Sequence, residues 1–233
     1  MFFGLTEEQE MIVETVRSFV ENEIYPHESL VESKGSVPTE IAQDIKQKCI
    51  NLGFYACNFP ENIGGAGLNH LDFALVEREL GRGSMALTHF FGRPQNILMA
   101  CKDEQIEKYL LPAVRGELMD ALAMTEPDAG SDVRGMKCFA KSEGSDWIVN
   151  GTKHFISGAE HADFVIVFIA TGEEETEKGP KKKITAFLVD RGTPGFVIRD
   201  GYNSVSHKGY KNMILEFDDC RLPKEQVLGE VDG

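Results

Sequence analysis

Residues 121–132, ALAMTEPDAGSD, mark the point at which the pattern of the sequence changes. A short apolar run ends at Met124, and the residues after it include three carboxylates, a proline, a glycine and two hydroxyls. Before this stretch apolar residues recur every three or four positions, and after it they alternate or form short runs. These periods are typical of helices and of strands. We therefore predict an α+β multidomain fold, with an N-terminal α-helical domain over residues 1–120 and an antiparallel β-barrel domain over residues 121–233.

The first two predicted helices have clear start and stop signals. Thr6 and Gln9 form a capping box, and the helix after them is predicted to end before Pro26. A second helix is predicted to begin at Pro38 and to end at Gly53. Their inward-facing residues are predicted to be Ile12, Val16, Phe19 and Val20 in the first helix, and Ile41, Ile45, Cys49 and Leu52 in the second.

Three further helices are predicted before residue 120. The third begins at an Asn69 cap and ends at Gly81, and the fourth begins at about Ser84. The fifth is predicted to be capped by Asp103 and to run to Gly116. Their inward-facing residues are predicted to be Leu71, Leu75 and Val76 in the third helix, and Ile106 and Leu110 in the fifth. Residues 59–69, FPENIGGAGLN, are predicted to form a loop because proline and glycine interrupt both regular structures.

Strands are predicted throughout the second half. In residues 146–157, DWIVNGTKHFIS, the Asn150-Gly151 pair is the favoured two-residue turn, so a hairpin is predicted there. Four apolar runs are predicted to be strands: FVIVFIA (164–170), ITAFLV (184–189), GFVIR (195–199) and MILEF (213–217). The charged run TGEEETEKGPKKK (171–183) favours a solvated hairpin loop, with a docking surface for a protein partner as the alternative.

Composition excludes several classes of function. The formal charge is −14 and the chain is 42% apolar, so a sizeable core is expected, while phosphates of nucleic acid and anionic membrane surfaces would be repelled. No apolar run is long enough for a membrane span. The acidic start MFFGLTEEQE is unlike a leader, and a cytoplasmic protein or a mature form of the mitochondrial matrix is expected.

The cysteines and histidines indicate no metal site. No cysteine pair has a CxxC spacing, and the six histidines form no HxH or HExxH pattern. Reduced, buried thiols are expected at all five cysteines, which are Cys49, Cys57, Cys101, Cys138 and Cys220.

The residues alone offer little catalytic chemistry. Glu126, Asp128 and Asp132 crowd one turn, where carboxylates are more often solvated than used as acid and base. Ser131 and Ser157 lack a GxSxG elbow, and the sequence has neither a GxGxxG nor a P-loop pattern. The turn does expose main-chain N–H groups that could hold an electron-rich ligand, although most turns of this kind are simple connections.

Several long segments resemble one family. These are NFPENIGGAGLNHLDFALVERELGRGSMAL (58–87), ALAMTEPDAGSDVRGMKCFA (121–140), WIVNGTKHFISGAEHADFVIVFIATG (147–172), RGTPGFVI (191–198) and LEFDDCRLP (215–223). In this order and at these separations they resemble the first two domains of an acyl-CoA dehydrogenase. The resemblance covers essentially all 233 residues.

The resemblance implies a FAD site in a cleft lined by the barrel. It implies that Thr125 donates to the pyrimidine edge of the flavin, that the Ser157 hydroxyl lies near flavin N5, and that Ser131 also contacts the thioester chain of an acyl-CoA substrate. The cofactor-binding residues that it implies are Leu122, Met124, Thr125, Gly130, Ser131, Phe155, Ile156 and Ser157. No metal is implied.

The resemblance also implies a reaction and its partners. In the family a glutamate removes a proton from C2 of an acyl-CoA while hydride leaves C3 for the flavin. The product is a trans-2-enoyl-CoA, and the electrons pass to an electron-transfer flavoprotein. The glutamate belongs to a C-terminal helical domain that would begin near VLGEVDG (227–233), so no catalytic residue is assigned here. The chain alone is expected to bind but not to oxidise, and the full-length protein is expected to be a dimer or tetramer.

Departures from the family pattern leave the substrate open. Phe155 stands where tryptophan is common, and Lys208 and Tyr210 stand where arginine and serine are common. Two alternatives also remain: an acyl-CoA oxidase that uses oxygen, and a non-catalytic acyl-CoA-binding module. On residue alternation, His154 is expected to point away from the flavin side. Trp147 is expected to be a packing residue.

Overall fold

The structure is a computed structural model that describes residues 4–177 and 179–232. Contacts between Cα atoms divide the chain into two compact units. The helical unit holds residues up to 96 together with 114–116 and 205–210, and the sheet unit holds the remainder. The predicted domain limits, 1–120 and 121–233, stay a prediction. Each unit is described by itself.

The first helix of the helical unit is longer than predicted. Helix α1 (Glu7–Phe19) continues through a π-helical turn (Val20–Ile24) into α2 (Tyr25–Lys34). The capping box is confirmed, because the Gln9 N–H donates to Thr6 Oγ1 at 3.2 Å and the Thr6 N–H donates to Gln9 Oε1 at 3.1 Å. The predicted end before Pro26 is wrong. Pro26 lies in the first turn of α2, directly after the π-helical turn, so the helix continues past the proline with a local change of helix type.

Helices α3 (Thr39–Asn51) and α4 (His70–Leu80) have the predicted boundaries, with Asn69 as the cap of α4. Three predicted core residues are wrong: Leu52 is 48% exposed, Leu71 is 59% exposed, and Ile106 of the fifth predicted helix is 36% exposed. Leu52 lies beyond the last turn of α3. The buried face of α4 includes two acidic residues, so an apolar pattern alone misplaces its centre, and Leu71 lies at its edge. The buried residues are Asp72, Leu75, Val76, Glu79 and Leu80.

The fourth and fifth predicted helices are shorter or less regular than expected. Helix α5 (Met85–Thr88) passes into a 3₁₀ turn (His89–Phe91). The fifth consists of a π-helical turn (Ile106–Leu110) followed by α6 (Leu111–Val114). The Asp103 main-chain carbonyl, rather than its carboxylate, accepts from the Ile106 N–H at 3.2 Å. Residues 59–69 contain a single 3₁₀ turn (Glu61–Ile63) and are otherwise irregular.

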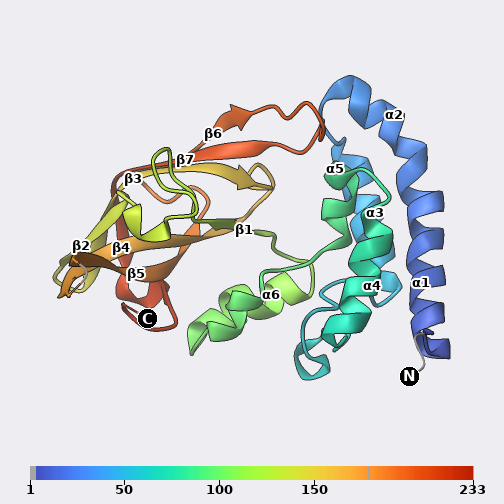
Figure 1. The fold of residues 1–233 in the computed structure, drawn as a ribbon, viewed down its shortest axis with the longest axis horizontal. Coiled ribbons are helices and arrows are strands. Elements are labelled where there is room, and N and C mark those ends of the chain that lie inside the picture. The colour runs from blue at the N-terminus through green and yellow to red at the C-terminus, as the bar shows by residue number, and fades with distance from the viewer. Residues whose placement is uncertain (1–3, 178, 233) are drawn as a thin grey trace. The chain divides into compact units, whose positions relative to one another are not determined.

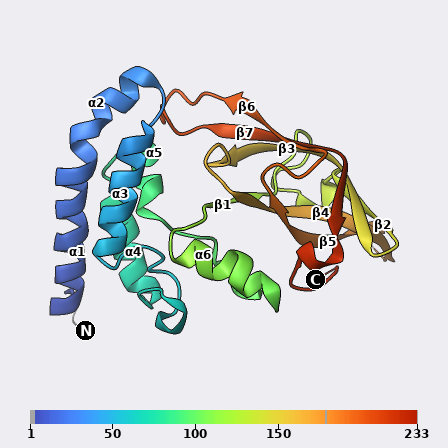
Figure 2. The ribbon, with the colours of Figure 1, turned by 180° about the vertical axis from the view of Figure 1, so that it is seen from behind.

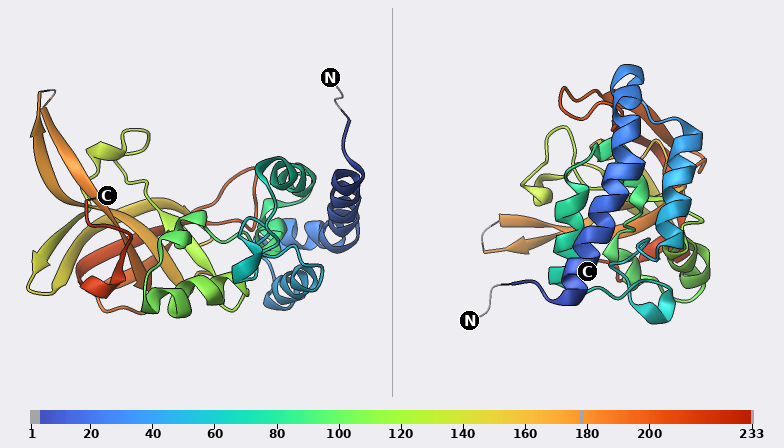
Figure 3. Two further views of the ribbon diagram at one scale, coloured as in Figure 1. Left: turned by 90° about the horizontal axis from the view of Figure 1, so that it is seen from below. Right: turned by 90° about the vertical axis from the view of Figure 1, so that its right-hand side faces the viewer.

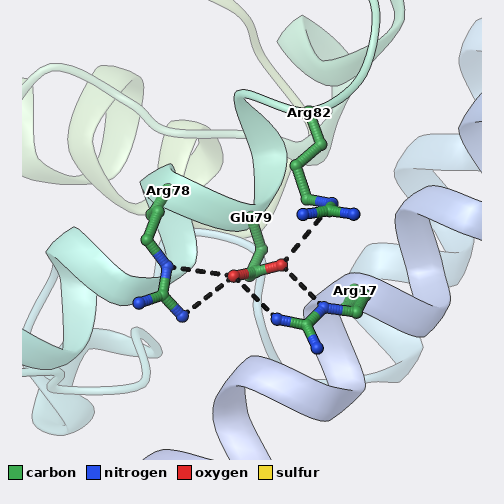
Figure 4. Close-up of polar contacts among 4 residues, drawn as sticks. All are labelled: Arg17, Arg78, Glu79 and Arg82. Carbon is green, nitrogen blue, oxygen red and sulfur yellow. Dashed lines mark hydrogen bonds and ion pairs between the residues drawn. The ribbon is translucent and has the colours of Figure 1, made fainter.

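A buried carboxylate joins α1 to α4 (Figure 4). The Glu79 side chain is 2% exposed, and its two oxygens accept from the Arg17 guanidinium at 3.0 and 3.3 Å. Arg78 lies 2.9 Å from one oxygen and Arg82 lies 3.8 Å from the other. Hydrogen bonding to Arg17 holds the pKa of Glu79 below its ordinary value. Figures 1 and 2 show α1 and α4 running side by side, so this cluster fixes their packing.

The substitution Glu79→Gln should lower the free energy of unfolding by about 2 kcal/mol at neutral pH, because bonds to a charged group are lost. The pKa of Glu79 is lowered in the folded state, so its contribution is complete above the pKa of the unfolded chain. It is lost as the pH falls through the folded-state pKa, and the two proteins should then become equally stable.

Urea unfolding between neutral and acidic pH measures this difference. Asp44→Asn is the matched control, because it removes a carboxylate whose partner Lys48 lies 2.7 Å away on the helix surface. That change should cost about 0.5 kcal/mol or less. A Glu79→Gln protein as stable as the control at neutral pH would contradict this role.

The sheet unit is one curled, mostly antiparallel sheet that forms a half-barrel (Figure 1). Its strand order is β6-β7-β3-β2-β4-β5-β8, and β1 pairs in parallel with β4. The predicted fold class is confirmed. The strands are β1 (Asp120–Ala123), β2 (Phe139–Glu143), β3 (Asp146–Ser157), β4 (Phe164–Thr176), β5 (Gly179–Asp190), β6 (Phe196–Tyr202), β7 (Asn212–Pro223) and β8 (Val227–Leu228).

The hairpin predicted at Asn150-Gly151 is wrong. Strand β3 runs through this pair without turning, and the turn lies earlier, where Glu143 of β2 pairs with Asp146 of β3. Between Val149 and Gly151 the register of β3 against β7 shifts, because β7 has one extra residue there, so the pair lies opposite a bulge in β7. The Asn150 side chain donates to Asp219 Oδ1 at 3.1 Å and accepts from the Asp219 N–H at 3.0 Å, so a side chain replaces the missing ladder bonds.

The close approach of Cys138 to β3 requires glycine at position 151, and this can be tested. Gly151 has φ +138°, and a Cβ there would lie 2.6 Å from the Cys138 Cα. Gly151→Ala should therefore cost about 3 kcal/mol or more, because strain and a backbone clash add. Gly144→Ala is the control: φ is +64° but nothing lies within 4 Å of the added Cβ. It should cost about 1 to 2 kcal/mol. Thermal or urea unfolding compares the two, and equal costs would refute the clash.

The inner face of the curled sheet holds the core of this unit. The core cluster comes from both ends of the sheet and includes Val149, Val167, Phe187 and Leu215. The ring of Trp147 packs edge-on against Phe187 at 5.7 Å, which confirms the expected packing role. All five cysteines are free and buried, as predicted. Burial raises the pKa of Cys101 and of Cys220 to about 11, so these thiols stay protonated at neutral pH.

The charged run 171–183 lies mostly within the strands β4 and β5. Glu173 pairs with Lys182 and Glu174 pairs with Lys181 across the ladder. Glu173 and Lys182 also form an ion pair. Figure 3 shows the two orange strands extending beyond the rest of the sheet as an arm. The predicted hairpin is therefore present but is a two-stranded arm rather than a loop. Among the described helices, none is both long enough and apolar enough to span a membrane.

Candidate functional site

The end of β1 and the bend of β3 meet in the sheet unit. Strand β1 ends at Ala123, and the next two residues continue toward β3. There the His154 N–H donates to the Thr125 carbonyl at 2.8 Å. The two bends that the sequence singles out, around Thr125 and around Ser157, therefore lie next to each other. They are the candidate site.

A short turn follows Thr125. The Glu126 N–H donates to the Ala129 carbonyl at 2.8 Å, and the Ala129 N–H donates back at 3.3 Å. The Glu126 side chain is 3% exposed and accepts from the main-chain N–H groups of Lys137 at 2.5 Å and Cys138 at 3.1 Å. The expectation that this carboxylate is solvated is wrong for Glu126. It lies under the turn and holds it to the segment that leads into β2.

Lys153 is the partner that the sequence analysis missed. Its side chain is fully buried, and Nζ lies 2.6 Å from Glu126 Oε1 and donates to the Met124 carbonyl at 3.1 Å. A signal for this burial was present in the sequence. Alternation along β3 places Lys153 on the same side as Val149, whose side chain is in the core, and a buried ammonium requires an anionic partner.

The bend of β3 is a second bulge. The register against β7 shifts between Lys153 and Ile156, and Phe155 has φ +59°, a left-handed conformation uncommon for a residue with a side chain. The Phe155 side chain is 53% exposed, and its ring stacks on Tyr202 of β6 with centroids 4.4 Å apart. The outward ring therefore depends on the bulge.

The alternation of His154 with Phe155, on which the expected direction of His154 rests, is absent for the same reason. Its Nδ1 lies 2.8 Å from the Tyr202 hydroxyl, so His154 and Phe155 both contact Tyr202. In a regular strand two neighbouring residues would point to opposite faces. The bulge at Phe155 removes this alternation.

The remaining predicted residues divide into two groups. Leu122 and Met124 are half-buried, while Ala121 and Ala123 of the same strand enter the core. Gly130 and Ser131 are exposed and lie on the far part of the turn. In the described part of the chain no hydrogen bond joins these two to the β3 bend. A hydrogen bond thus joins Thr125 to the β3 bend, while the places of Gly130 and Ser131 in the site stay a prediction.

The other predicted residues of the β3 bend, Ile156 and Ser157, have different surroundings. Ile156 is 2% exposed in the core, so only its main chain faces outward. The Ser157 hydroxyl donates to Asn212 Oδ1 at 2.9 Å, which fixes its rotamer. Asp128 is exposed beside Lys137 at 2.6 Å, and this hydrogen bond lowers the pKa of Asp128. Within residues 4–177 and 179–232 no cluster of side chains has the composition of a metal site.

Comparison with known proteins identifies the family. The N-terminal domain of acyl-CoA dehydrogenases matches residues 6–117, and the middle domain matches residues 121–220. The human short-chain specific acyl-CoA dehydrogenase of mitochondria (Homo sapiens) is 34% identical over 232 residues. That alignment covers 97% of this chain and 54% of the human protein, so the chain spans about half of its relative's length.

Solved structures agree with this match. A putative acyl-CoA dehydrogenase from Mycobacterium smegmatis superposes with a TM-score of 0.84 at 29% identity, over 98% of this chain and 59% of that one. A glutaryl-CoA dehydrogenase from the same organism, solved in complex with FADH2, gives 0.81 at 29% identity, over 98% and 57% of the two chains. The likeness covers both the helical and the sheet units. The chain therefore belongs to the acyl-CoA dehydrogenase family.

Proposed function

We propose that the protein containing this chain is a FAD-dependent acyl-CoA dehydrogenase that converts an acyl-CoA thioester to the trans-2-enoyl-CoA. The observation that carries the proposal is the contact of the two bends, in which the His154 N–H donates to the Thr125 carbonyl at 2.8 Å. These bends contain most of the residues that the family resemblance assigns to the flavin. The family membership of the chain supports the same assignment.

The residues at the bends suit a planar, electron-rich ring. In the part of the chain that the structure describes, the Thr125 N–H has no acceptor within hydrogen-bond distance, so it is available to a ligand. Leu122 and Met124 offer a half-buried apolar surface beside it. Phe155 adds an exposed aromatic ring. Apolar walls with a few fixed donors are typical of cofactor sites.

When bound, FAD supplies the acceptor for the hydride that leaves C3 of the acyl group. The Thr125 N–H and hydroxyl would hold the electron-rich pyrimidine edge of the ring with donors that need no reorganisation. The bend at Phe155, Ile156 and Ser157 would hold the opposite part. Asn212 keeps the Ser157 hydroxyl in one rotamer, so that its oxygen is already in position.

The base that removes the C2 proton is assigned to a residue outside these two units. Glu126 is the carboxylate nearest in sequence to Thr125, but it is buried and accepts hydrogen bonds from Lys153, Lys137 and Cys138. The side chain is 3% exposed, so a substrate carbon cannot reach its oxygens. We therefore give Glu126 no part in proton transfer.

The proposal also names partners. Ser131, on the exposed part of the turn, would contact the thioester chain of the substrate. The full-length protein would be a dimer or tetramer and would pass its electrons to an electron-transfer flavoprotein. Turnover of the full-length protein with oxygen as sole acceptor would indicate an oxidase instead.

The full-length gene product should be purified with the absorbance of oxidised flavin, and this absorbance should bleach when acyl-CoAs are added. Thr125→Val should weaken FAD binding about tenfold, because one hydrogen bond to the ring is lost. Thr152→Val is the control, since it makes the same change at a half-buried position of β3.

Flavin fluorescence quenching measures both dissociation constants. A colourless protein that stays colourless with added FAD would overturn the proposed function. Equal affinities of the two variants would show that the Thr125 hydroxyl does not bind the flavin, while leaving the function open to other donors, the Thr125 N–H among them.

A further inference from the structure

Lys153 and Glu126 form a buried ion pair that the proposed chemistry does not use. The Lys153 side chain is fully buried, that of Glu126 is 3% exposed, and Nζ lies 2.6 Å from Oε1. A second Lys153 bond goes to the Met124 carbonyl at 3.1 Å. The pair therefore connects β3 both to the turn at Glu126 and to the peptide group that joins Met124 to Thr125.

Stability alone does not account for this pair. Removing two charges from water is costly, and well-packed apolar residues of similar volume often replace a buried ion pair at no loss of stability. An apolar side chain at position 153 would have apolar neighbours to pack against, because Val149 and Ile156 of the same strand lie in the core. What an apolar pair could not provide is a donor to the Met124 carbonyl.

The bond to Met124 fixes the direction of the Thr125 N–H. The chain has no cis peptide bond among its described residues, so the N–H of Thr125 and the carbonyl of Met124 lie in one peptide plane and point in opposite directions. With that carbonyl turned toward Lys153, the N–H points away from the buried pair. It is the same N–H that has no acceptor in the described part of the chain.

The Thr125 carbonyl is held independently. It accepts from the His154 N–H at 2.8 Å, and the next residue is held at its carboxylate by the Lys137 and Cys138 N–H groups. Both peptide groups around Thr125 are thus fixed from the β3 side. The Lys153 ammonium also polarises the Met124–Thr125 peptide, which makes its N–H a stronger donor.

We infer that Lys153 and Glu126 are positioning residues that aim and strengthen the Thr125 N–H toward the flavin. This inference rests on the proposed function. Glu126 neutralises the ammonium and fixes its place, and Lys153 acts on the peptide. A stronger donor favours the reduced form of the cofactor, which carries more negative charge, so the pair should raise the reduction potential of bound FAD.

The test uses the FAD-loaded full-length protein and a neutral variant, Glu126→Gln with Lys153→Met, which removes both charges and leaves no unpaired ion. Its affinity for reduced FAD should fall about tenfold more than its affinity for oxidised FAD. For a two-electron couple this lowers the potential by about 30 mV. Spectroelectrochemistry of the bound flavin measures the shift.

The matched control is Asp190→Asn with Lys108→Met. It makes the same chemical change in an exposed pair of the sheet unit, whose Nζ and Oδ2 atoms lie 2.7 Å apart. Its potential should equal that of the wild type. If the first variant does not fold, Glu126→Gln with Lys153→Gln carries the test, since two amides can bond to each other in the buried space.

The outcomes separate the inference from the proposed function. A wild type that binds no FAD overturns the proposed function. A wild type that binds FAD, with a neutral variant that melts earlier but keeps the wild-type potential, overturns the inference and leaves a purely structural pair. A lowered potential in the neutral variant, with no change in the control, supports it.

Discussion

The geometry of the candidate site depends on one buried contact between an ammonium and a carboxylate. Lys153 and Glu126 come from segments that are far apart along the chain, and each is satisfied only when those segments lie together. Leaving either charge unpaired in the core costs several kcal/mol. The pair therefore specifies which turn meets which strand, and the neighbouring main-chain bond at Thr125 follows from it.

The site also depends on bulges in the ladder between β3 and β7. The ladder between β3 and β7 has two bulges, one in β7 opposite Gly151 and one in β3 at Phe155, and the second removes the alternation of side chains that a regular strand would have. The first is stabilised by an asparagine that bonds to β7 and the second by a stacked tyrosine from β6. Neighbouring strands thus support the distortion at the positions where the outward-facing groups of the site are needed.

Much of the fold was predictable from local signals, while the site was predictable only in part. Caps such as Thr6 and Asn69 act within one helical turn, so they can be read directly from the sequence. The Asn150-Gly151 pair can form a hairpin turn or lie within a strand at an irregularity of the ladder. Pairing with β7 determines which of the two is formed. The burial of Glu126 likewise depends on Lys153, a residue from another segment of the chain. The three carboxylates in the turn had instead indicated that Glu126 is solvated.

The arm formed by β4 and β5 has an open edge along β5. From Gly179 to Thr185 this strand pairs with β4 on one side, and among the described residues it has no ladder partner on the other side. An open edge of this kind invites pairing with another chain. Three consecutive lysines lie on that edge. Two β5 edges brought together would place ammonium groups against each other, so the lysines disfavour pairing between two such edges, while the glutamates opposite them on β4 keep the arm folded.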